Sequence, residues 1–503
     1  MKANRVNQTV SVSPKHKKIV LALAFAWTAP LVLSSAFAQE KPPTVAVTSA
    51  QKSTQVTQEN DLLNLYRQAA LSDPTFSAAR YSFLAGKEKK WQGLSVLSPQ
   101  VVATGSETTN DLYRKSAALG TTELKSRAWT VKLTQPLLNW DKWEQFGQGN
   151  LNSAIAEAQF AAAEQDLVLR VTEAYFNVLN AQDTLNLNRN KKALISEQLE
   201  QAKRNFEVGT ATITDTHEAQ SRYDLVVAQE LAAEADLLIK RSALEQITGS
   251  SIGSLKSLSS QAKIEVIAKD RKIKLKNNEK PKKINIENTV AVQPGQTMND
   301  WVNQAEQVSY SIMASKLAYD VATKETKRAY AGHAPSVDLV AQRGYSDSEG
   351  AVGTDAVTST KTFSNQVMVQ VTVPLFSSGY NQSVVREKSA LASKALADLE
   401  STRRNVAQAT RQAYLGFNNG LAQVKAYEAA EISALSALES NKLGYEVGVR
   451  INIDVLNAQD TLFTTRRDLA KARYDAILNG LKLKAQAAVL SDEDLQSVNA
   501  LLK

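Results

Sequence analysis

The chain contains one short pattern twice, and this duplication constrains the fold more than any other feature. Residues 206–221 read FEVGTATITDTHEAQS, and residues 445–460 read YEVGVRINIDVLNAQD. At an offset of 239 residues the two stretches share Glu, Val, Gly, Asp, Ala and Gln, and Phe206 aligns with Tyr445. A match this dense inside one chain indicates two copies of one structural unit.

The duplication extends over most of the chain. Pro99 aligns with Pro335 at an offset of 236, and Gly209 aligns with Gly448 at 239, so a few short insertions separate the copies. Each copy predicts the order helix, strand, strand, long helix, tight turn and shorter helix. We expect a first repeat at residues 60–249, a second repeat at 299–490, and a C-terminal tail at 491–503.

A stretch without proline runs from residue 140 to 207 and predicts one helix on the order of 100 Å long. A seven-residue apolar period within it is typical of coiled coils, and it is formed by Leu167, Val171, Ala174, Val178, Ala181, Leu185, Ile195, Leu199, Ala202 and Phe206. The second copy has Thr410, Gly420 and Asn441 at matching positions, which favours helices packed loosely in a curved wall rather than a dry two-stranded zipper. A shorter helix is expected after each long one, at roughly 215–248 and 454–489.

Two pairs of strands are predicted from alternating apolar and polar residues. The first pair, 99–107 and 127–139, surrounds a polar loop near 110–126, and the second pair is 334–346 and 365–376. One apolar face is expected to carry Trp129, Val131, Leu133, Val337, Leu339, Val367, Val369, Val371 and Val373.

The N-terminus resembles an export signal. Residues 1–38 combine basic residues, an apolar stretch and the small-x-small pattern Ala36-Phe37-Ala38. A retained signal anchor is the alternative. Residues 39–59 are predicted to be a flexible N-terminal segment.

Charge and composition exclude several functions. The chain has 59 basic and 51 acidic residues, a net charge of +8, and the leader holds five basic residues and no acidic one, which leaves +3. This charge does not indicate a nucleic-acid binder. The chain has no cysteine and three histidines, and no nucleophile–base pattern or phosphate loop is present. We therefore expect no catalytic residues, no cofactor and no bound metal.

The segment between the two repeats has no counterpart elsewhere in the chain. Residues 250–298 contain the run 263–283, with nine basic and three acidic side chains. We interpret it as a solvated basic linker whose KIKLK is a short edge strand. A patch for an acidic partner is the alternative.

Several short motifs, in the order typical of the family, make the chain resemble the TolC-like outer-membrane efflux and secretion channels. They are the twin turns quoted above, the junctions TQPLLNW and TVPLFSSG, and the stretches DLLNLYRQAALSDP, AYFNVLNAQ and ALEQITG. The resemblance implies a mainly α-helical fold with a small β part. It further implies a homotrimer in which four strands per subunit form a 12-stranded barrel, continued by a periplasmic α-helical barrel. The apolar face would then contact outer-membrane lipid.

The resemblance also implies a gate at the periplasmic tip formed by the two turns. Tyr445 and Arg450 match the family's latch on the second turn, and Thr214 and Asp215 match their partners on the first. Asp454 and Asn457 occupy positions where the family often has two acidic residues, so one carboxylate ring is expected in place of two. Asp215 and Asp454 could also be simple helix N-caps. Gly209 and Gly448 fit the residues that end helices.

The function implied is a passive exit duct in the outer membrane of a Gram-negative bacterium, with a large periplasmic part. Its partners would be a periplasmic adaptor and an inner-membrane ABC or proton-driven transporter. The alternative is a periplasmic coiled-coil scaffold or adaptor without a pore. The sequence leaves open the cargo, the particular transporter, the open or closed state, and the role of the basic linker.

Overall fold

A computed structural model of the chain describes residues 60–112, 122–210, 212–259, 297–351 and 357–502. The chain divides into Met1–Thr57 and Gln58–Lys503, and every described residue belongs to the second unit. The expected signal peptide, the flexible segment 39–59 and most of the basic linker lie outside the described residues.

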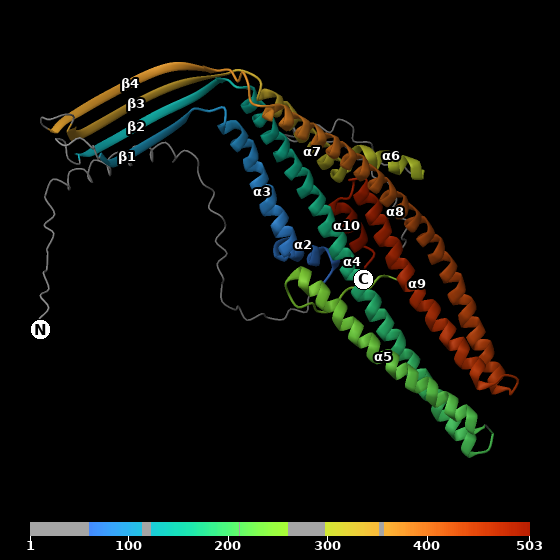
Figure 1. Ribbon diagram of the computed structural model, residues 1–503. Coiled ribbons are helices and arrows are strands. Elements are labelled where there is room, and N and C mark those ends of the chain that lie inside the picture. The colour runs from blue at the N-terminus through green and yellow to red at the C-terminus, as the bar shows by residue number, and fades with distance from the viewer. Residues whose placement is uncertain (1–59, 113–121, 211, 260–296, 352–356, 503) are drawn as a thin grey trace, which may run out of the picture. The chain divides into compact units, whose positions relative to one another are not determined.

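The described unit contains the same succession of elements twice (Figure 1). The first half comprises α2 (Leu62–Ser72), α3 (Pro74–Ser95), β1 (Gln100–Leu112), β2 (Thr122–Leu138), α4 (Trp140–Glu207) and α5 (Ile213–Thr248). The second comprises α6 (Met298–Val308), α7 (Tyr310–Ala331), β3 (Ser336–Ala351), β4 (Val357–Thr372), α8 (Tyr380–Glu446) and α9 (Asn452–Gln486), followed by α10 (Asp492–Asn499).

Two aspartates set the start of the first two helices. The Asp61 carboxylate accepts a hydrogen bond from the Asn64 N–H at 2.8 Å, which begins α2. Asp73 separates α2 from α3, where Pro74 occupies the first position that needs no N–H donor. Arg170 on α4 donates to Asp73 at 2.7 Å, so this capping group also joins α3 to the long helix.

Two long helical hairpins form most of the unit, α4 with α5 and α8 with α9. The expected seven-residue pattern of α4 is largely buried, from Leu167 to Ala202. The small residue Gly420 on α8 lies against Ala476 on α9, where an added Cβ would come within 3.1 Å of the Ala476 Cβ. Thr410 is fully buried and donates its hydroxyl to the Val406 carbonyl at 2.8 Å. At Gly420 the two helices therefore approach each other more closely than the loose packing that was expected, because glycine has no side chain.

The main hydrophobic core lies where α2, α4, α9 and α10 meet, between the sheet and the hairpin tips. Leu62, Tyr175, Ile477 and Leu495 are fully buried there. The Tyr175 hydroxyl donates to the Lys256 carbonyl at 2.7 Å, so its polar end is satisfied. This core fixes the two halves of the chain to each other.

The four strands form one antiparallel sheet in the order β1-β2-β3-β4, so the two repeats pair through β2 and β3. Directly paired residues share a face. The register places eight of the nine residues predicted for the apolar face on one side: Trp129, Val131, Leu133, Val337, Leu339, Val367, Val369 and Val371. Val373 lies just beyond the end of β4. We call this side the apolar face.

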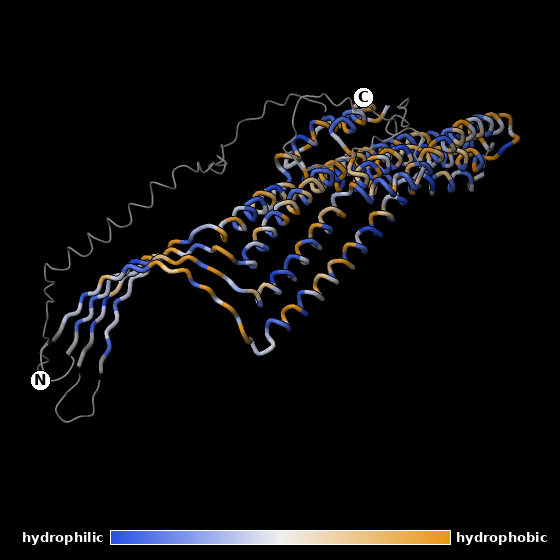
Figure 2. The backbone as a smooth tube through the Cα atoms, turned by 90° about the horizontal axis from the view of Figure 1, so that it is seen from above, coloured by the Kyte–Doolittle hydropathy of each residue, from blue (hydrophilic) through white to orange (hydrophobic). Residues whose placement is uncertain are grey.

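The opposite side of the sheet, which we call the polar face, carries mainly hydroxyl and amide side chains. Gln342 donates to Gln366 across β3 and β4 at 2.7 Å. Gly344 lies between Thr130 and Ser364, whose hydroxyl oxygens would be 3.2 and 3.0 Å from an added Cβ. Figure 2 shows that apolar residues concentrate where the strands meet the helices, while the distal ends are more hydrophilic.

The strands are longer than the alternation predicted. β1 continues to Leu112 and β2 begins at Thr122, so the polar loop expected near 110–126 is partly strand. β3 likewise continues to Ala351. Polar residues continue the ladder without an apolar pattern because the ladder is formed by backbone pairing, as between Leu112 and Thr122 and between Ala351 and Val357.

None of the helices in the described ranges is long and apolar enough to cross a membrane.

Candidate functional site at the hairpin tips

Both hairpins reverse direction through a glycine with positive φ. Gly209 has φ 77° and Gly448 has φ 76°, a conformation that L side chains rarely adopt. The Gly209 N–H donates to the Phe206 carbonyl at 3.0 Å, and the Gly448 N–H donates to the Tyr445 carbonyl at 3.1 Å. Each glycine thus ends its long helix as the repeated pattern indicated.

The helices that follow the turns begin differently in the two hairpins. Thr212 is the N-cap of α5, and the Asp215 carboxylate accepts from the Thr212 N–H at 3.0 Å, which completes a capping box. Ile451 is the N-cap of α9 and makes no side-chain cap hydrogen bond. Neither Asp215 nor Asp454 is therefore a simple N-cap, and only Asp215 is held by capping contacts.

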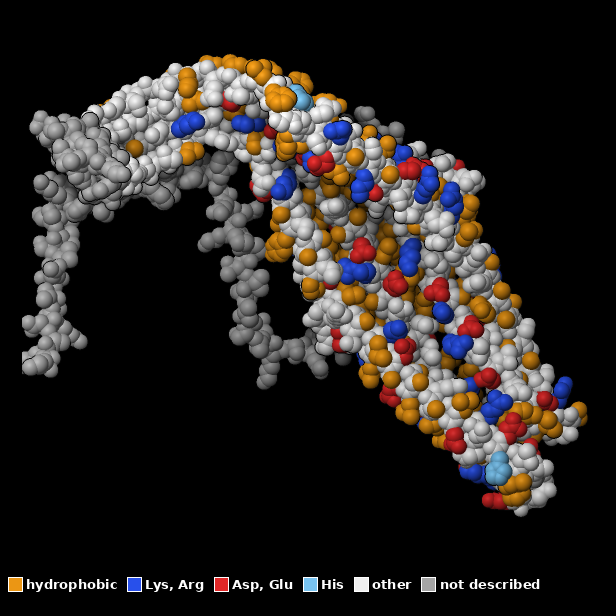
Figure 3. All heavy atoms as spheres, in the orientation of Figure 1, with side chains coloured by type: hydrophobic (Ala, Val, Ile, Leu, Met, Phe, Trp, Pro, Cys, Tyr) orange, Lys and Arg blue, Asp and Glu red, His pale blue; other side chains and the backbone are white. Residues whose placement is uncertain are grey.

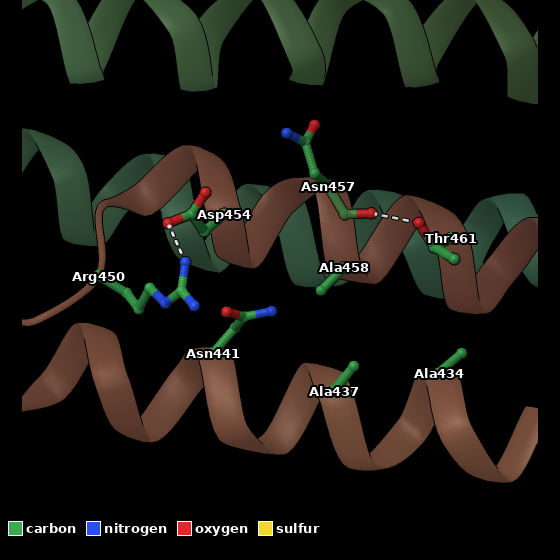
Figure 4. Close-up of a pocket in the computed structure, with 8 residues that line it drawn as sticks. All are labelled: Ala434, Ala437, Asn441, Arg450, Asp454, Asn457, Ala458 and Thr461. Atoms are coloured by element: carbon green, nitrogen blue, oxygen red, sulfur yellow. Dashed lines mark hydrogen bonds and ion pairs between the residues drawn. The ribbon is translucent and has the colours of Figure 1, made fainter.

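Arg450 folds back over the second turn. Its aliphatic stem covers Gly444, where an added Cβ would lie 2.7 Å from the Arg450 Cγ. Its guanidinium reaches Asp454, with 3.5 Å between Nη1 and Oδ2. The acidic residue of the expected ring thus has a cation beside it (Figure 4).

A cavity of about 340 Å³ opens between α8 and α9 at this point. Three alanines of the two helices, Ala434, Ala437 and Ala458, line it together with polar groups. The polar lining consists of Asn441, Arg450, Asp454, Asn457 and Thr461. Because the alanines are small, the helices leave room here for a side chain or for solvent.

Asn457 makes a contact that its position in the turn did not predict. Its side-chain oxygen accepts from Arg222 on α5, with 3.1 Å between Nη2 and Oδ1. Its backbone carbonyl accepts from the Thr461 hydroxyl at 2.9 Å, and Figure 4 shows the amide pointing away from α8. Nearby, Lys191 on α4 forms an ion pair with Asp460 on α9. Two polar contacts therefore join α9 to the other hairpin.

The Tyr445 hydroxyl accepts from Asn205 on α4, with 3.4 Å between the atoms. Thr214 is exposed. Within the described part of the chain, no hydrogen bond or ion pair joins Thr214 or Asp215 to Tyr445 or Arg450. The structure thus brings together Arg450, Asp454 and Asn457 around one cavity, and it pairs Tyr445 with a residue outside the predicted set.

Sequence reasoning missed Asn205, Arg222 and the Lys191–Asp460 pair. One signal was available for Arg222, because it lies seven residues after Asp215 and therefore on the same stripe of a coiled-coil helix. No comparable signal pointed to Asn205, since its contact depends on how two hairpins are set against each other.

A buried polar pair lies farther from the tip. The Tyr474 hydroxyl on α9 donates to Asp183 on α4 at 2.6 Å. Burial raises the pKa of the Asp183 carboxyl, and the hydrogen bond from Tyr474 only partly offsets this effect. Burial and the neighbouring Asp183 also raise the pKa of Tyr474. This pair is a further polar connection between the repeats.

Across the described ranges, no three or more His, Cys, Asp or Glu side chains are grouped to hold a metal ion.

Residues 65–250 and 301–487 match the Outer membrane efflux protein family, and the chain belongs to this family. It is 30% identical over 451 residues to the outer membrane protein TolC of Escherichia coli (strain K12), covering 88% of this chain and 85% of TolC. It is 28% identical over 447 residues to the alkaline protease secretion protein AprF of Pseudomonas aeruginosa, covering 87% and 86%.

A solved structure shares the fold. The outer membrane protein VceC from Vibrio cholerae matches with a TM-score of 0.67 at 16% identity, over 85% of this chain and 96% of VceC. The chain is therefore an outer-membrane channel of the efflux family with a periplasmic part, and its family is one of transport ducts rather than enzymes.

Proposed function

We propose that the chain is one subunit of a homotrimeric exit duct, through which an inner-membrane transporter exports cargo with the help of a periplasmic adaptor. Four strands from each of three subunits would form one 12-stranded barrel. The paired hairpins would continue it as a helical barrel, and the tips at Gly209 and Gly448 would be its periplasmic gate.

The observation that carries this proposal is an amphipathic four-stranded sheet with two open edges. In the described chain β1 and β4 each pair on one side only, over 13 and 16 residues. Long open edges invite pairing with another chain, and a membrane leaves no water to satisfy them. Four strands are too few to close a barrel, whereas three copies supply twelve.

The two faces of the sheet support its placement in a membrane. Val367, Val369 and Val371 are 60 to 75% exposed on the apolar face, which is costly in water over a large area. Figure 3 shows exposed apolar side chains along the sheet and its junction with the helices, whereas Lys, Arg, Asp and Glu are interspersed over the helical part. Lipid would cover the apolar face, and the polar face would line a water-filled passage.

The tip geometry supports a gate. Arg450, Asp454 and Asn457 lie at the end of one hairpin, and threefold symmetry would bring three copies of each around the axis. Asp454 would supply the single ring of carboxylates, and Tyr445 with Arg450 would hold the tip. Thr214 and Asp215 would take part on the neighbouring turn.

The relatives indicate two kinds of cargo. AprF is an alkaline protease secretion protein, and the family is that of the outer membrane efflux proteins. We infer that this chain serves efflux or type I secretion as a passive duct, and that its inner-membrane partner sets the cargo.

The test is assembly and conductance of the full chain. Detergent-solubilised protein should have the mass of a trimer in native mass spectrometry and should conduct ions in planar lipid bilayers. A monomeric protein that forms no channels would overturn the proposal.

A further inference from the structure

A cation, Arg343, lies between the aromatic and the aliphatic residues of the apolar face of the sheet. Arg343 on β3 is directly paired with Val131 on β2 and with Asn365 on β4, so its side chain shares the face of the predicted lipid-contacting residues. It is exposed. The next pairs toward the helices are apolar, with Ala341 between Leu133 and Val367.

Arg343 and its neighbour Asn365 have no partner in the described part of the chain. Gln135, another polar residue on the same face, has hydrogen-bond partners within the chain. Its amide donates to the carbonyls of Leu97 and Pro136, both at 2.9 Å. Arg343 and Asn365 make no such hydrogen bond or ion pair among the described residues, so their donors are free for a group outside the chain.

The position of Arg343 along the strand is that of a membrane interface. Two residues farther toward the distal end, Trp129, Tyr345 and Phe363 form an aromatic row across three strands of the same face. Tyr345 and Phe363 are in contact, with ring centroids 4.9 Å apart. Aromatic rings gather where hydrocarbon meets headgroups. Arg343 lies one pair on the hydrocarbon side of this row, within reach of the interface for a long side chain.

The carboxylates beyond the aromatic row are already engaged. Glu107 pairs with Arg127 at 2.9 Å. Asp347, which is four residues along the strand of Arg343, accepts from the Tyr345 hydroxyl at 3.3 Å and from the Ser359 hydroxyl at 3.2 Å. The Glu107 and Asp347 carboxylates thus have hydrogen-bond partners in the described part of the chain, whereas Arg343 has neither a hydrogen bond nor a counterion there.

An arginine on the lipid face is strongly destabilising at the bilayer midplane and costs little near the interface. Its planar fork of donors matches the oxygens of a phosphate. We propose that Arg343, assisted by the Asn365 amide, binds the phosphate of a lipid headgroup in the outer leaflet. This inference rests on the proposed function, because it places the apolar face in the membrane.

The site would take an anionic lipid whose phosphate lies at the level of the aromatic row. The guanidinium would rise along the strand toward the interface and bind two phosphate oxygens, while Asn365 donates to a third. The acyl chains of the same lipid would lie on Val131 and Val367, which are exposed on the same face. The polar side chains would thus recognise the phosphate of the lipid, and the valines would contact its acyl chains.

The experiment uses the full-length assembly in detergent, with bound lipid measured by native mass spectrometry. Diphosphorylated lipid A is the probe, and lipid A without its phosphates is the comparison. Wild-type protein should retain the phosphorylated form, and Arg343→Gln should weaken its binding by about tenfold, as loss of a charge-assisted contact implies. Arg343→Lys should recover part of the binding because it keeps the charge.

Lys132→Gln is the matched control. Lys132 is exposed on the polar face and directly paired with Gln342, the residue before Arg343, so the substitution removes a positive charge at the same level on the other side of the sheet. It should leave lipid A binding unchanged. Added inorganic phosphate should not displace the lipid, because the acyl chains contribute to binding.

Equal retention of lipid A by wild type and Arg343→Gln, or equal binding of the form without phosphates, would overturn the assignment of Arg343. A trimeric, conducting protein that retains neither lipid would overturn the lipid site but leave the proposed duct standing. A monomeric, non-conducting protein would overturn the proposed duct and this site together.

Discussion

Arg222 on α5 donates a hydrogen bond to the side-chain oxygen of Asn457 on α9, with 3.1 Å between Nη2 and Oδ1. The bond joins the returning helix of the first hairpin to that of the second. Asp460, three residues after Asn457 on α9, forms an ion pair with Lys191 on α4. Movement of α9 away from α5 and α4 would break both contacts.

Arg222→Ala should therefore favour the open gate. A hydrogen bond of this kind contributes about 0.5–1.5 kcal/mol, so open probability should rise roughly two- to tenfold. Single-channel recording in planar bilayers measures the change. Lys240→Ala is the control, because Lys240 is on the same helix and pairs only with Asp236 of that helix among the described residues. Identical open probabilities for wild type and Arg222→Ala would remove the bond from the gate.

Asn457→Asp should act in the opposite direction. It turns a neutral acceptor into a carboxylate facing Arg222, so the hydrogen bond from the guanidinium becomes an ion pair and the closed gate is stabilised. Combined with Arg222→Ala, the same carboxylate loses its partner, and block by multivalent cations should increase. A double-mutant cycle on conductance separates the two effects. Additive changes would show that the residues do not interact.

Replacing Tyr445 by Phe and Arg450 by Ser should raise single-channel conductance. The first change removes the hydroxyl that accepts from Asn205, and the second removes the guanidinium that reaches Asp454. Each contact is partly exposed and therefore weak, so the double variant should raise conductance only severalfold. Conductance equal to wild type would exclude these residues from the latch.

Asp454→Ala should relieve block by multivalent cations such as hexaamminecobalt(III). The expected constriction holds one carboxylate per subunit, because Asn457 carries no charge, so this substitution removes its acidic ring. Arg450→Ser should strengthen the block, since it leaves the Asp454 carboxylate without its neighbouring cation. Cation titrations of conductance measure both, and equal block in wild type and Asp454→Ala would place the binding site elsewhere.

Asp73, which is buried, and Asp183, which is half-buried, should give opposite pH effects on stability. Burial alone would raise the pKa of Asp73, but hydrogen bonds from Arg170, Thr75 and the Phe76 N–H outweigh it and lower the pKa. Its stabilising contribution is therefore present above the unfolded pKa of about 3.9 and is lost as pH falls through the lower folded value. Asp73→Asn should lower the free energy of unfolding by about 1–3 kcal/mol at pH 7, and by less at acidic pH.

Ionisation of Asp183 has the opposite effect on stability. Its pKa is raised by burial, so the ionised form destabilises the folded state as pH rises above the unfolded value. Asp183→Asn keeps an oxygen to accept from Tyr474 and should raise the melting temperature at pH 7. Thermal unfolding of the two variants at pH 7 and pH 4 makes the comparison. A lower melting temperature for Asp183→Asn at pH 7 would contradict the effect of burial.

Much of the helical architecture was predictable. The range 140–207 coincides with α4, because Asn139 accepts from the Lys142 N–H at 3.2 Å and Gly209 ends the helix. The strands were predictable only where an apolar side chain alternates with a polar one. Residues 108–112, 122–126, 347–351 and 357–364 were missed because their side chains show no sustained apolar alternation, although their backbones continue the ladder.

The candidate site was predictable in its members but not in its contacts. The turn pattern placed Arg450, Asp454 and Asn457 together, since residues three and four apart share a helix face. The partners Arg222 and Asn205 could not be inferred, because they depend on the rotation of one hairpin against another. The same reason applies to Asp183 and Tyr474, which lie 291 residues apart in the chain.

The pairing of β2 with β3 has a consequence for how such a duct diversifies. Within one chain, the second strand of one repeat pairs with the first strand of the next, and the proposed joint between subunits, β4 with β1, has the same form. Three chains would therefore present six quasi-equivalent units around the ring. Because one chain holds two units, a substitution in one unit occurs three times around the ring, at every second unit. Arg450, which aligns with Ala211 in the repeated pattern, is such a difference. Fusion thus permits alternating lobes of a ring to take separate roles, which six identical units could not do.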